Sequence, residues 1–211
     1  MEKLLVATRS TGKMREIRRI LGSVGGLSVL SLDEAGIEPS PEEEDLEPYD
    51  TFEENARSKA RYFAAKAGLP TVADDSGIVV DALDGAPGVR SKRFAPAAEA
   101  GALGQDEANN RHLVARLEGV APERRTARYV CVAVLVDGSG HELVTRGEAE
   151  GRIVDQPRGS GGFGYDPHVL VPELDRTYAE LSPEEKDARS HRGAAFRELA
   201  RGLQSERRDL S

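Results

Sequence analysis

The chain has 211 residues, enough for one large domain or for two lobes that share a core, and its composition is that of a globular protein, with 38% hydrophobic and 31% charged residues. The net charge of −8 argues against a general binder of nucleic acid or of acidic membranes. No apolar run approaches the ~18 residues that a membrane span needs. The single cysteine, Cys131, excludes an internal disulfide and predicts a cytoplasmic protein with a buried, inert thiol.

A strand over residues 3–8 (KLLVAT) and a helix over 14–26 (MREIRRILGSVGG) are predicted first, with a polar loop between them. A turn from strand to helix presents backbone N–H groups to an anion. The loop carries small hydroxyl side chains together with Gly12 and Lys13, so it can cradle phosphate oxygens, although the spacing of a Walker P-loop is absent. An ordinary turn with capping hydroxyls and a surface lysine is an equally open interpretation.

The next predicted elements are a strand over residues 27–32, an acidic loop over 38–50 and a helix over 51–68. Thr51 has the position of an N-cap, and Glu54, three residues later, completes a capping box. This pattern predicts that the helix begins directly after Thr51.

Two adjacent carboxylates, Asp74 and Asp75, interrupt an apolar stretch that we predict to form two strands, over residues 70–75 and 77–83. Neighbouring side chains of a strand point to opposite faces, so both carboxylates can serve one site only if the first strand ends there. Ser76 and Gly77 favour such an end. Carboxylate oxygens suit Mg²⁺ or Mn²⁺, whereas the structural alternative is that the two acids cap a turn or pair with arginines.

The rest of the chain alternates helical and strand patterns, which predicts an α/β fold with a long mixed sheet flanked by helices on both sides and a β-rich second lobe. The remaining predicted elements are a loop over 84–96, a helix over 105–118, a hairpin of strands 125–137 and 141–154 joined by DGSG, and a last helix over 182–204 with Ser182 as its N-cap.

Two further segments carry residues suited to ligand binding. The Gly-rich stretch 159–167 (GSGGFGYDP) lets the backbone approach a ligand closely, and Phe163 and Tyr165 offer rings on which a planar base can stack. In the last predicted helix, Lys186 stands close to His191 and Arg192, which together make a cluster of hydrogen-bond donors.

Five segments in this order resemble the inosine/xanthosine triphosphate pyrophosphatase family nearly from end to end: LLVATRSTGK, TFEENARSKA, ADDSGIVVDALDGAPGVRS, GSGGFGYDP and EEKDARSHRG. The resemblance implies an elongated mixed sheet with flanking helices and a central cleft, residues 1–211 being a single domain of two lobes. It implies a Mg²⁺-dependent homodimer that hydrolyses the non-standard nucleotides ITP, dITP and XTP to the monophosphate and pyrophosphate. The partner would be a small-molecule nucleotide, with no nucleic acid and no membrane.

The resemblance also assigns roles to individual residues. It gives the triphosphate to the first turn and to one lysine of the second helix: Thr8, Arg9, Ser10, Thr11, Gly12, Lys13 and Lys59. It gives the base, the sugar and neighbouring substrate contacts to Ser76, Phe163, Gly164, Tyr165, Asp166, Lys186, His191 and Arg192. Asp75 is the implied proton acceptor, and Asp75, Asp74 and Glu47 are the implied metal ligands.

Two positions depart from the pattern of the family. Ser10 stands where the family usually has asparagine, which bears on one phosphate or sugar contact. Tyr49 stands where it usually has glycine, which bears on the metal role of Glu47. Two alternatives are a related pyrophosphatase for modified pyrimidine or 7-methylguanine nucleotides, and a catalytically silent nucleotide-binding module.

Overall fold

The computed structural model describes residues 2–22 and 24–209, and the chain divides into two compact units. The first unit comprises the described residues up to Asp75, the segment Cys131–Gly147 and the described residues from His191 onward. The second unit comprises Ser76–Val130 and Glu148–Ser190. The interpretation of residues 1–211 as a single domain of two lobes stays a prediction.

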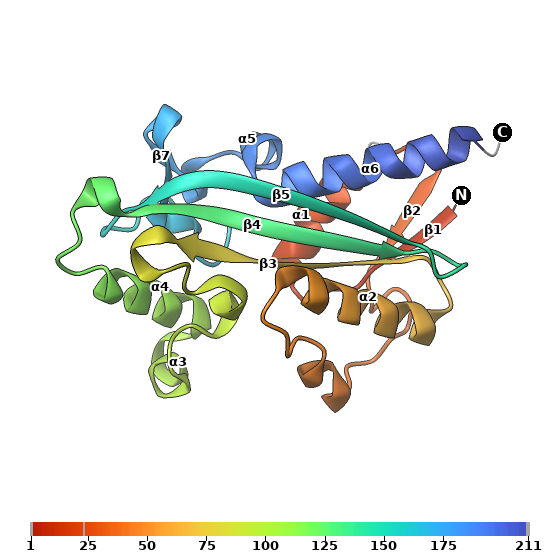
Figure 1. Ribbon diagram of the computed structural model, residues 1–211, viewed down its shortest axis with the longest axis horizontal. Coiled ribbons are helices and arrows are strands. Elements are labelled where there is room, and N and C mark those ends of the chain that lie inside the picture. Colours follow the sequence, from red (N-terminus) through yellow and green to blue (C-terminus); the bar gives the residue numbers. More distant parts are fainter. Residues whose placement is uncertain (1, 23, 210–211) are drawn as a thin grey trace. The chain divides into compact units, whose positions relative to one another are not determined.

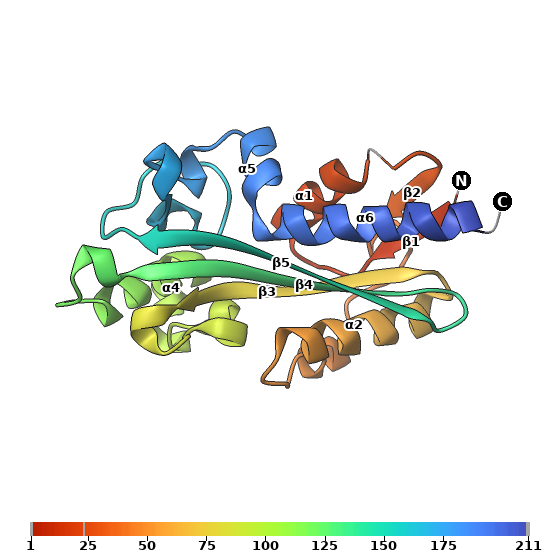
Figure 2. The same cartoon turned by 45° about the horizontal axis from the view of Figure 1, so that its top comes forward.

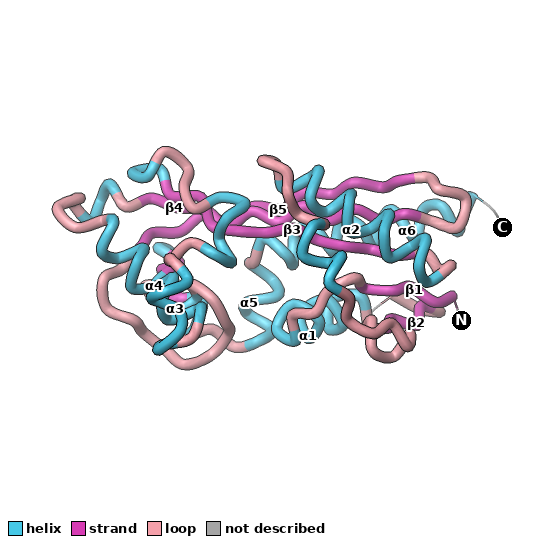
Figure 3. The backbone as a smooth tube through the Cα atoms, turned by 90° about the horizontal axis from the view of Figure 1, so that it is seen from below, coloured by secondary structure: helices cyan, strands magenta, loops and turns pink. Residues whose placement is uncertain are grey.

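A seven-stranded mixed sheet is formed by the described residues, in the order β2-β1-β3-β4-β5-β6-β7, which confirms the predicted fold class. The strands are β1 (Glu2–Val6), β2 (Leu27–Leu30), β3 (Thr71–Val80), β4 (Thr126–Val136), β5 (Glu142–Ile153), β6 (Val169–Val171) and β7 (Arg176–Thr177). Strand β1 pairs in parallel with β2 and β3, whereas β6 pairs antiparallel with β5 and β7. The pairing of β1 with β2 is visible in Figure 3.

The helices within the described residues are α1 (Thr11–Leu21), α2 (Phe52–Ala67), α3 (Ala97–Leu103), α4 (Gln105–Arg116), α5 (Pro183–Arg189) and α6 (His191–Asp209). In the first unit, α1 and α6 cover one face of the sheet and α2 covers the other (Figures 1 and 2). Strand β1 supplies Leu4 and Val6 to the core under α1 and α6, and Leu5 to the core under α2. This alternation is what a strand buried on both faces requires.

The second unit has a core of its own, built on α4 and on the strand residues that fall within this unit. Leu113 of α4 packs with Ile78 of β3, Ile153 of β5 and Val169 of β6, and all four side chains are buried. The core extends to Tyr165, so the Gly-rich segment that precedes it in the sequence is attached to this core.

The prediction of two strands around Asp74 and Asp75 is wrong, because β3 runs without interruption from Thr71 to Val80. Gly77 does not end the strand: a Cβ atom at this position would lie 2.3 Å from the carbonyl oxygen of Gly88, so glycine is needed for the close approach of that segment.

Other elements also differ from the prediction. Helix α1 begins at Thr11 rather than at Met14, because Ser10 acts as its N-cap. Helix α3 was not predicted. The last predicted helix is two helices, since Ser190 is extended (φ −72°, ψ 154°) and caps α5. By contrast, the predicted N-caps Thr51 and Ser182 are confirmed: each accepts a hydrogen bond from the backbone N–H three residues later.

Gly147 of β5 fixes the position of α6, because the helix packs directly on the strand backbone at this point. A Cβ atom here would lie 2.1 Å from the carbonyl oxygen of His191 and 2.6 Å from the backbone nitrogen of Ala195. We therefore expect Gly147→Ala to lower the free energy of unfolding by about 1–3 kcal/mol, as overpacked core substitutions do.

Urea titration of Gly147→Ala beside Gly138→Ala tests this expectation. Gly138 lies in the turn between β4 and β5, and a Cβ atom there would meet nothing within 4 Å. The Gly138 variant should match the parent protein within about 0.5 kcal/mol. Equal stability of the two variants would contradict the role of Gly147.

Candidate active site

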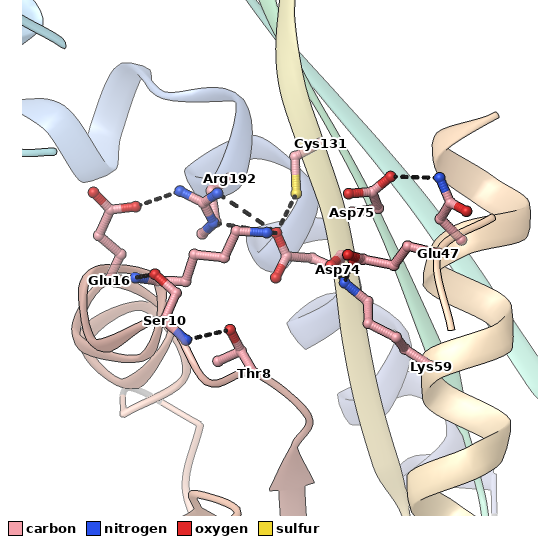
Figure 4. A network of polar contacts seen from close by, with 11 residues as sticks. Thr8, Ser10, Glu16, Glu47, Lys59, Asp74, Asp75, Cys131 and Arg192 are labelled. Atoms are coloured by element: carbon pink, nitrogen blue, oxygen red, sulfur yellow. Dashed lines mark hydrogen bonds and ion pairs between the residues drawn. The ribbon is translucent and has the colours of Figure 1, made fainter. Parts of the chain in front are cut away.

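A buried ion-pair cluster surrounds Asp74, on the face of β3 that α1 and α6 cover (Figure 4). Asp74 is 2% exposed, and its Oδ2 atom lies 3.0 Å from Lys13 Nζ and 3.5 Å from the Arg192 guanidinium. The Cys131 thiol is 3.8 Å from the same oxygen. The other oxygen, Oδ1, is buried and has no hydrogen-bond partner within the described part of the chain.

The electrostatics of this cluster keep Asp74 ionised. Burial alone would raise its pKa, but the positive charges of Lys13, Arg192 and Lys59 outweigh burial and hold the pKa of Asp74 well below its ordinary value. Burial and the negative charge of Asp74 raise the pKa of Cys131 far above that of an ordinary thiol. Cys131 is therefore the inert thiol that the sequence predicts.

The local structure of the first turn brings Lys13 to Asp74. The Ser10 hydroxyl caps α1 by accepting a hydrogen bond of 3.3 Å from the backbone N–H of Lys13, and the Thr8 hydroxyl accepts one of 3.2 Å from the N–H of Ser10. One turn further along α1, the buried Glu16 accepts a hydrogen bond of 2.6 Å from Arg192. Helices α1 and α6 are thus joined to β3 by charge as well as by apolar packing.

Asp75 occupies a different environment. It lies two residues after Ala73 in β3 and therefore on the same face of the strand, where Ala73 packs under α2. Its Oδ2 atom accepts a hydrogen bond of 3.1 Å from Asn55, and the side chain is almost fully buried. Burial raises the pKa of Asp75 above its ordinary value, although Lys59 and Lys13 oppose this shift. The negative charge of Glu47 raises the pKa of Asp75 further.

Lys59 of α2 connects this environment to the acidic loop. Its ammonium group pairs with Glu47 and donates a hydrogen bond of 2.7 Å to the backbone carbonyl of Asp74. Burial would lower the pKa of Lys59, but the charges of Glu47, Asp75 and Asp74 raise it, so Lys59 stays protonated.

Asn55 also explains how Tyr49 is accommodated in place of a glycine. The Asn55 side chain accepts a hydrogen bond of 2.9 Å from the N–H of Tyr49 and donates one of 3.1 Å to its carbonyl oxygen. The Tyr49 residue itself is 45% exposed, so the loop is fixed through its backbone. The departure at this position therefore leaves Glu47 beside Lys59.

The predicted metal group of Glu47, Asp74 and Asp75 is not assembled as one ligand set. Within residues 2–22 and 24–209, no group of three or more histidine, cysteine, aspartate or glutamate side chains is arranged to hold a metal ion. Because β3 continues through Ser76, Asp74 and Asp75 point to opposite faces, and Asp74 faces cations. Asp75 and Glu47 fit a hard divalent cation, since both offer carboxylate oxygens and they lie close enough for the charge of Glu47 to add to burial in raising the pKa of Asp75.

A second cluster of predicted residues lies within the second unit. Asp166 is 3% exposed and pairs with Lys186, while its two oxygens accept hydrogen bonds from Tyr129 (3.1 Å) and from the backbone N–H of Phe163 (2.9 Å). The Lys186 ammonium lies 4.7 Å from the centroid of the Phe163 ring, within the range of a cation–π contact.

The structure thus divides the predicted site residues into two groups. Thr8, Ser10, Lys13, Lys59, Asp74, Asp75 and Arg192 belong to the contacts of the first unit. Phe163, Gly164, Tyr165, Asp166 and Lys186 belong to those of the second. Ser76 is half-buried next to Asp75, His191 is buried at the start of α6, and Thr11 and Gly12 lie in the first turn of α1. Arg9 forms ion pairs with Glu43 of the acidic loop and with Asp33, which precedes that loop.

Sequence reasoning missed two residues of the first unit that contact the predicted site, Glu16 and Asn55. Each is a polar side chain on the buried face of an amphipathic helix, and each is at most 5% exposed. A polar residue in such a position must be hydrogen-bonded, and this is the signal by which both residues could have been found.

Comparisons with known proteins agree with this fold. A model of the Ham1 family matches residues 4–202. The chain is 50% identical over 209 residues to a dITP/XTP pyrophosphatase of Mycolicibacterium paratuberculosis, with 97% of each chain covered. It is 48% identical to a dITP/XTP pyrophosphatase of Frankia alni, with 94% of this chain and 95% of that one covered. The structure of a HAM1 protein from Coxiella burnetii superimposes with a TM-score of 0.81 at 36% identity, covering 97% of this chain and 100% of that one.

The mixed sheet, its paired acidic and basic side chains and these relatives define a nucleoside triphosphate pyrophosphatase, which confirms the resemblance seen in the sequence. The chain belongs to the Ham1 family. Pyrophosphatases of this family generally need a divalent metal ion. In the described part of the chain, no helix is both long enough and apolar enough to cross a membrane.

The Asp74 cluster predicts a specific dependence of stability on pH. Since the pKa of Asp74 is lower in the folded state than in the unfolded chain, its ionisation stabilises the fold above a pH of about 4, and this contribution is lost as the pH falls toward the folded pKa. We expect Asp74→Asn to lower the free energy of unfolding at pH 7 by about 3–5 kcal/mol, because it leaves buried cations without their carboxylate.

Denaturant unfolding of the parent protein and of Asp74→Asn at several pH values measures this effect. The difference between the two should shrink as the pH falls below about 4. A difference that stays constant down to the lowest pH at which both proteins fold would contradict the assignment.

Proposed function

We propose that this protein hydrolyses the non-standard purine nucleotides ITP, dITP and XTP to the nucleoside monophosphate and pyrophosphate, thereby removing them from the nucleotide pool. The observation that carries the proposal is the contrast between two adjacent carboxylates. Asp74 is held ionised by Lys13 and Arg192, whereas Asp75 has a raised pKa beside Asn55 and Lys59. The dITP/XTP pyrophosphatases among the relatives support the choice of substrate.

We assign the metal of this site as Mg²⁺, with Asp75 and Glu47 as the residues that would hold it. When bound, the ion supplies neutralising charge for the phosphate oxygens. Asp74 has a different role in this proposal: it anchors Lys13 and Arg192, which its Oδ2 atom contacts.

Asp75 acts as the general base of the proposed reaction. It orients a water molecule and accepts its proton, while the water oxygen forms a bond to the α-phosphorus and the bond to the pyrophosphate oxygen breaks. Asn55 supports this role by donating a hydrogen bond to Oδ2, which fixes the orientation of the carboxylate. Lys59 and Lys13 bear positive charges that offset the charge developing on the leaving pyrophosphate.

The second cluster is suited to a purine base. Phe163 provides a ring for stacking, and Lys186 and Asp166 hold charged, hydrogen-bonded positions beside it. A backbone N–H group would meet the 6-oxo oxygen of hypoxanthine or xanthine. Adenine presents an amino group there, so two donors would face each other without an acceptor, which is costly in a buried site.

The oligomeric state and the compartment belong to this proposal as well. The family resemblance favours a homodimer, and the single buried cysteine is in keeping with a cytoplasmic protein.

A pyrophosphate-release assay tests the proposed substrates. ITP, dITP and XTP should be hydrolysed with kcat/KM values at least about a hundredfold above that for ATP, because the site would leave a donor unpaired. Omitting Mg²⁺ should abolish the release of pyrophosphate. Comparable kcat/KM for ITP and ATP would refute the account of selectivity, and a preference for modified pyrimidine or 7-methylguanine nucleotides would establish the alternative substrate class.

Asp75→Asn tests the general base. The amide keeps the shape of the side chain but accepts no proton, so we expect kcat for ITP to fall by about 10²–10⁴-fold. The far-UV circular dichroism and the unfolding midpoint should show an intact fold. A variant with the kcat of the parent protein would remove Asp75 from the mechanism.

A further inference from the structure

The Gly-rich loop of the second unit is held by α4 through both peptide groups of one residue. The Asp106 Oδ2 atom accepts a hydrogen bond of 3.0 Å from the N–H of Gly164, and Asn110 Nδ2 donates one of 3.0 Å to the carbonyl oxygen of Gly164. Asp106 and Asn110 are four residues apart, so they lie on the same face of the helix. Two side chains therefore fix the orientation of the backbone between Phe163 and Tyr165.

The conformation that these contacts hold is one that only glycine adopts readily. Gly164 has φ +63°, in the left-handed region, yet a Cβ atom at this position would meet nothing within 4 Å. The glycine is thus required by the backbone conformation rather than by lack of space. Because a glycine can also adopt other conformations, the contacts from α4 select this one.

The opposite side of the loop is held by Asp166. The backbone N–H of Phe163 donates to Asp166 Oδ2 (2.9 Å), and a Cβ atom on Gly162 would lie 2.0 Å from the same oxygen. The consecutive N–H groups of Phe163 and Gly164 are therefore each bound to a carboxylate, one from the loop itself and one from α4. These two attachments fix the backbone on both sides of the Phe163 carbonyl group.

Helix α4 also fixes the segment that receives Tyr165. The Tyr165 hydroxyl donates a hydrogen bond of 2.7 Å to the carbonyl oxygen of Ser91. Asn109 donates to the same oxygen (3.2 Å) and to the carbonyl of Lys92 (3.2 Å), and it accepts from the N–H of Ala95 (2.8 Å). Three neighbouring polar residues of one helix thus hold the loop and its anchor.

The amide of Asn110 serves this loop rather than the packing of its helix. Asn110 is 5% exposed, and its Oδ1 atom is buried with no hydrogen-bond partner in residues 2–22 and 24–209. An unpaired buried acceptor disfavours folding, and an apolar side chain would avoid that cost. The contact that the amide does make is the one to Gly164.

We propose that Asp106 and Asn110 are positioning residues for base binding: by holding both peptide groups of Gly164, they set the place of Phe163, on whose ring the base of the nucleotide would stack. This inference rests on the proposed function. It assigns the two residues no contact with the reacting atoms.

Substitutions that remove or keep the hydrogen bonds to Gly164 distinguish a positioning role from a role in folding alone. Asn110→Asp replaces the donor with an oxygen that faces the Gly164 carbonyl, so we expect KM for ITP to rise about tenfold or more, with kcat little changed. Asp106→Ala should act in the same direction. Asp106→Asn keeps an acceptor for the Gly164 N–H and should behave like the parent protein.

Glu107→Gln is the matched control, since Glu107 lies on the same helix in an exposed ion pair with Arg111. It should leave KM unchanged. The proposal is overturned if Asn110→Asp and Asp106→Ala both keep the KM of the parent protein for ITP, or if Asp106→Asn and Glu107→Gln raise that KM by as much as Asp106→Ala does. Should Asn110→Asp fail to fold, Asp106→Ala against Asp106→Asn decides.

Hydrogen–deuterium exchange distinguishes failure of this inference from failure of the proposed function. Peptides that cover residues 162–166 should exchange faster in Asp106→Ala than in Asp106→Asn, whatever the substrate is. A parent protein that hydrolyses no 6-oxopurine nucleotide would refute the proposed function, while equal exchange in the two variants would refute the positioning of the loop.

Discussion

The buried carboxylate of Asp74 is the interaction on which the first unit depends. It lies in the middle of β3, and it contacts one cation from α1 and one from α6, two helices that are far apart in the sequence. Removing a carboxylate from water is unfavourable unless positive charge accompanies it, so the helices and the strand stabilise one another. Glu16 of α1 forms a second ion pair with Arg192, through the Nη1 atom of the guanidinium. The same contacts place Lys13 at the start of α1, where a phosphate group would meet backbone N–H groups as well.

The continuity of β3 gives the two neighbouring aspartates different chemistry. Because successive side chains of a strand point to opposite faces, Asp74 faces Lys13 and Arg192, while Asp75 faces Asn55 on α2. The first carboxylate is stabilised in its charged form, whereas burial raises the pKa of the second. One strand therefore supplies both a fixed negative charge that organises cations and a base for the proposed reaction.

The sequence predicted those parts of the structure that depend on local interactions. The N-caps Thr51 and Ser182 and the turn between β4 and β5 were found because the signal lies within a few residues. Ser76 and Gly77 predicted a break between two strands, but Gly77 lies within β3, and its role is to admit the distant Gly88 carbonyl. The partner of Arg192 could not be predicted either, since Asp74 is distant in sequence and only the fold of the first unit brings the two together. The same holds for Asn110 and Gly164. Polar contacts between residues far apart in the sequence could therefore not be predicted from local sequence patterns.

The division of roles between Asp74 and Asp75 is tested most directly by locating the metal. A crystal structure with Mn²⁺ in place of Mg²⁺ and a non-hydrolysable ITP analogue would show the ion by its anomalous scattering. We predict a peak at coordination distance from a carboxylate oxygen of Asp75, with Asp74 still paired to Lys13 and Arg192. A peak on Asp74, or one remote from both residues, would contradict the account.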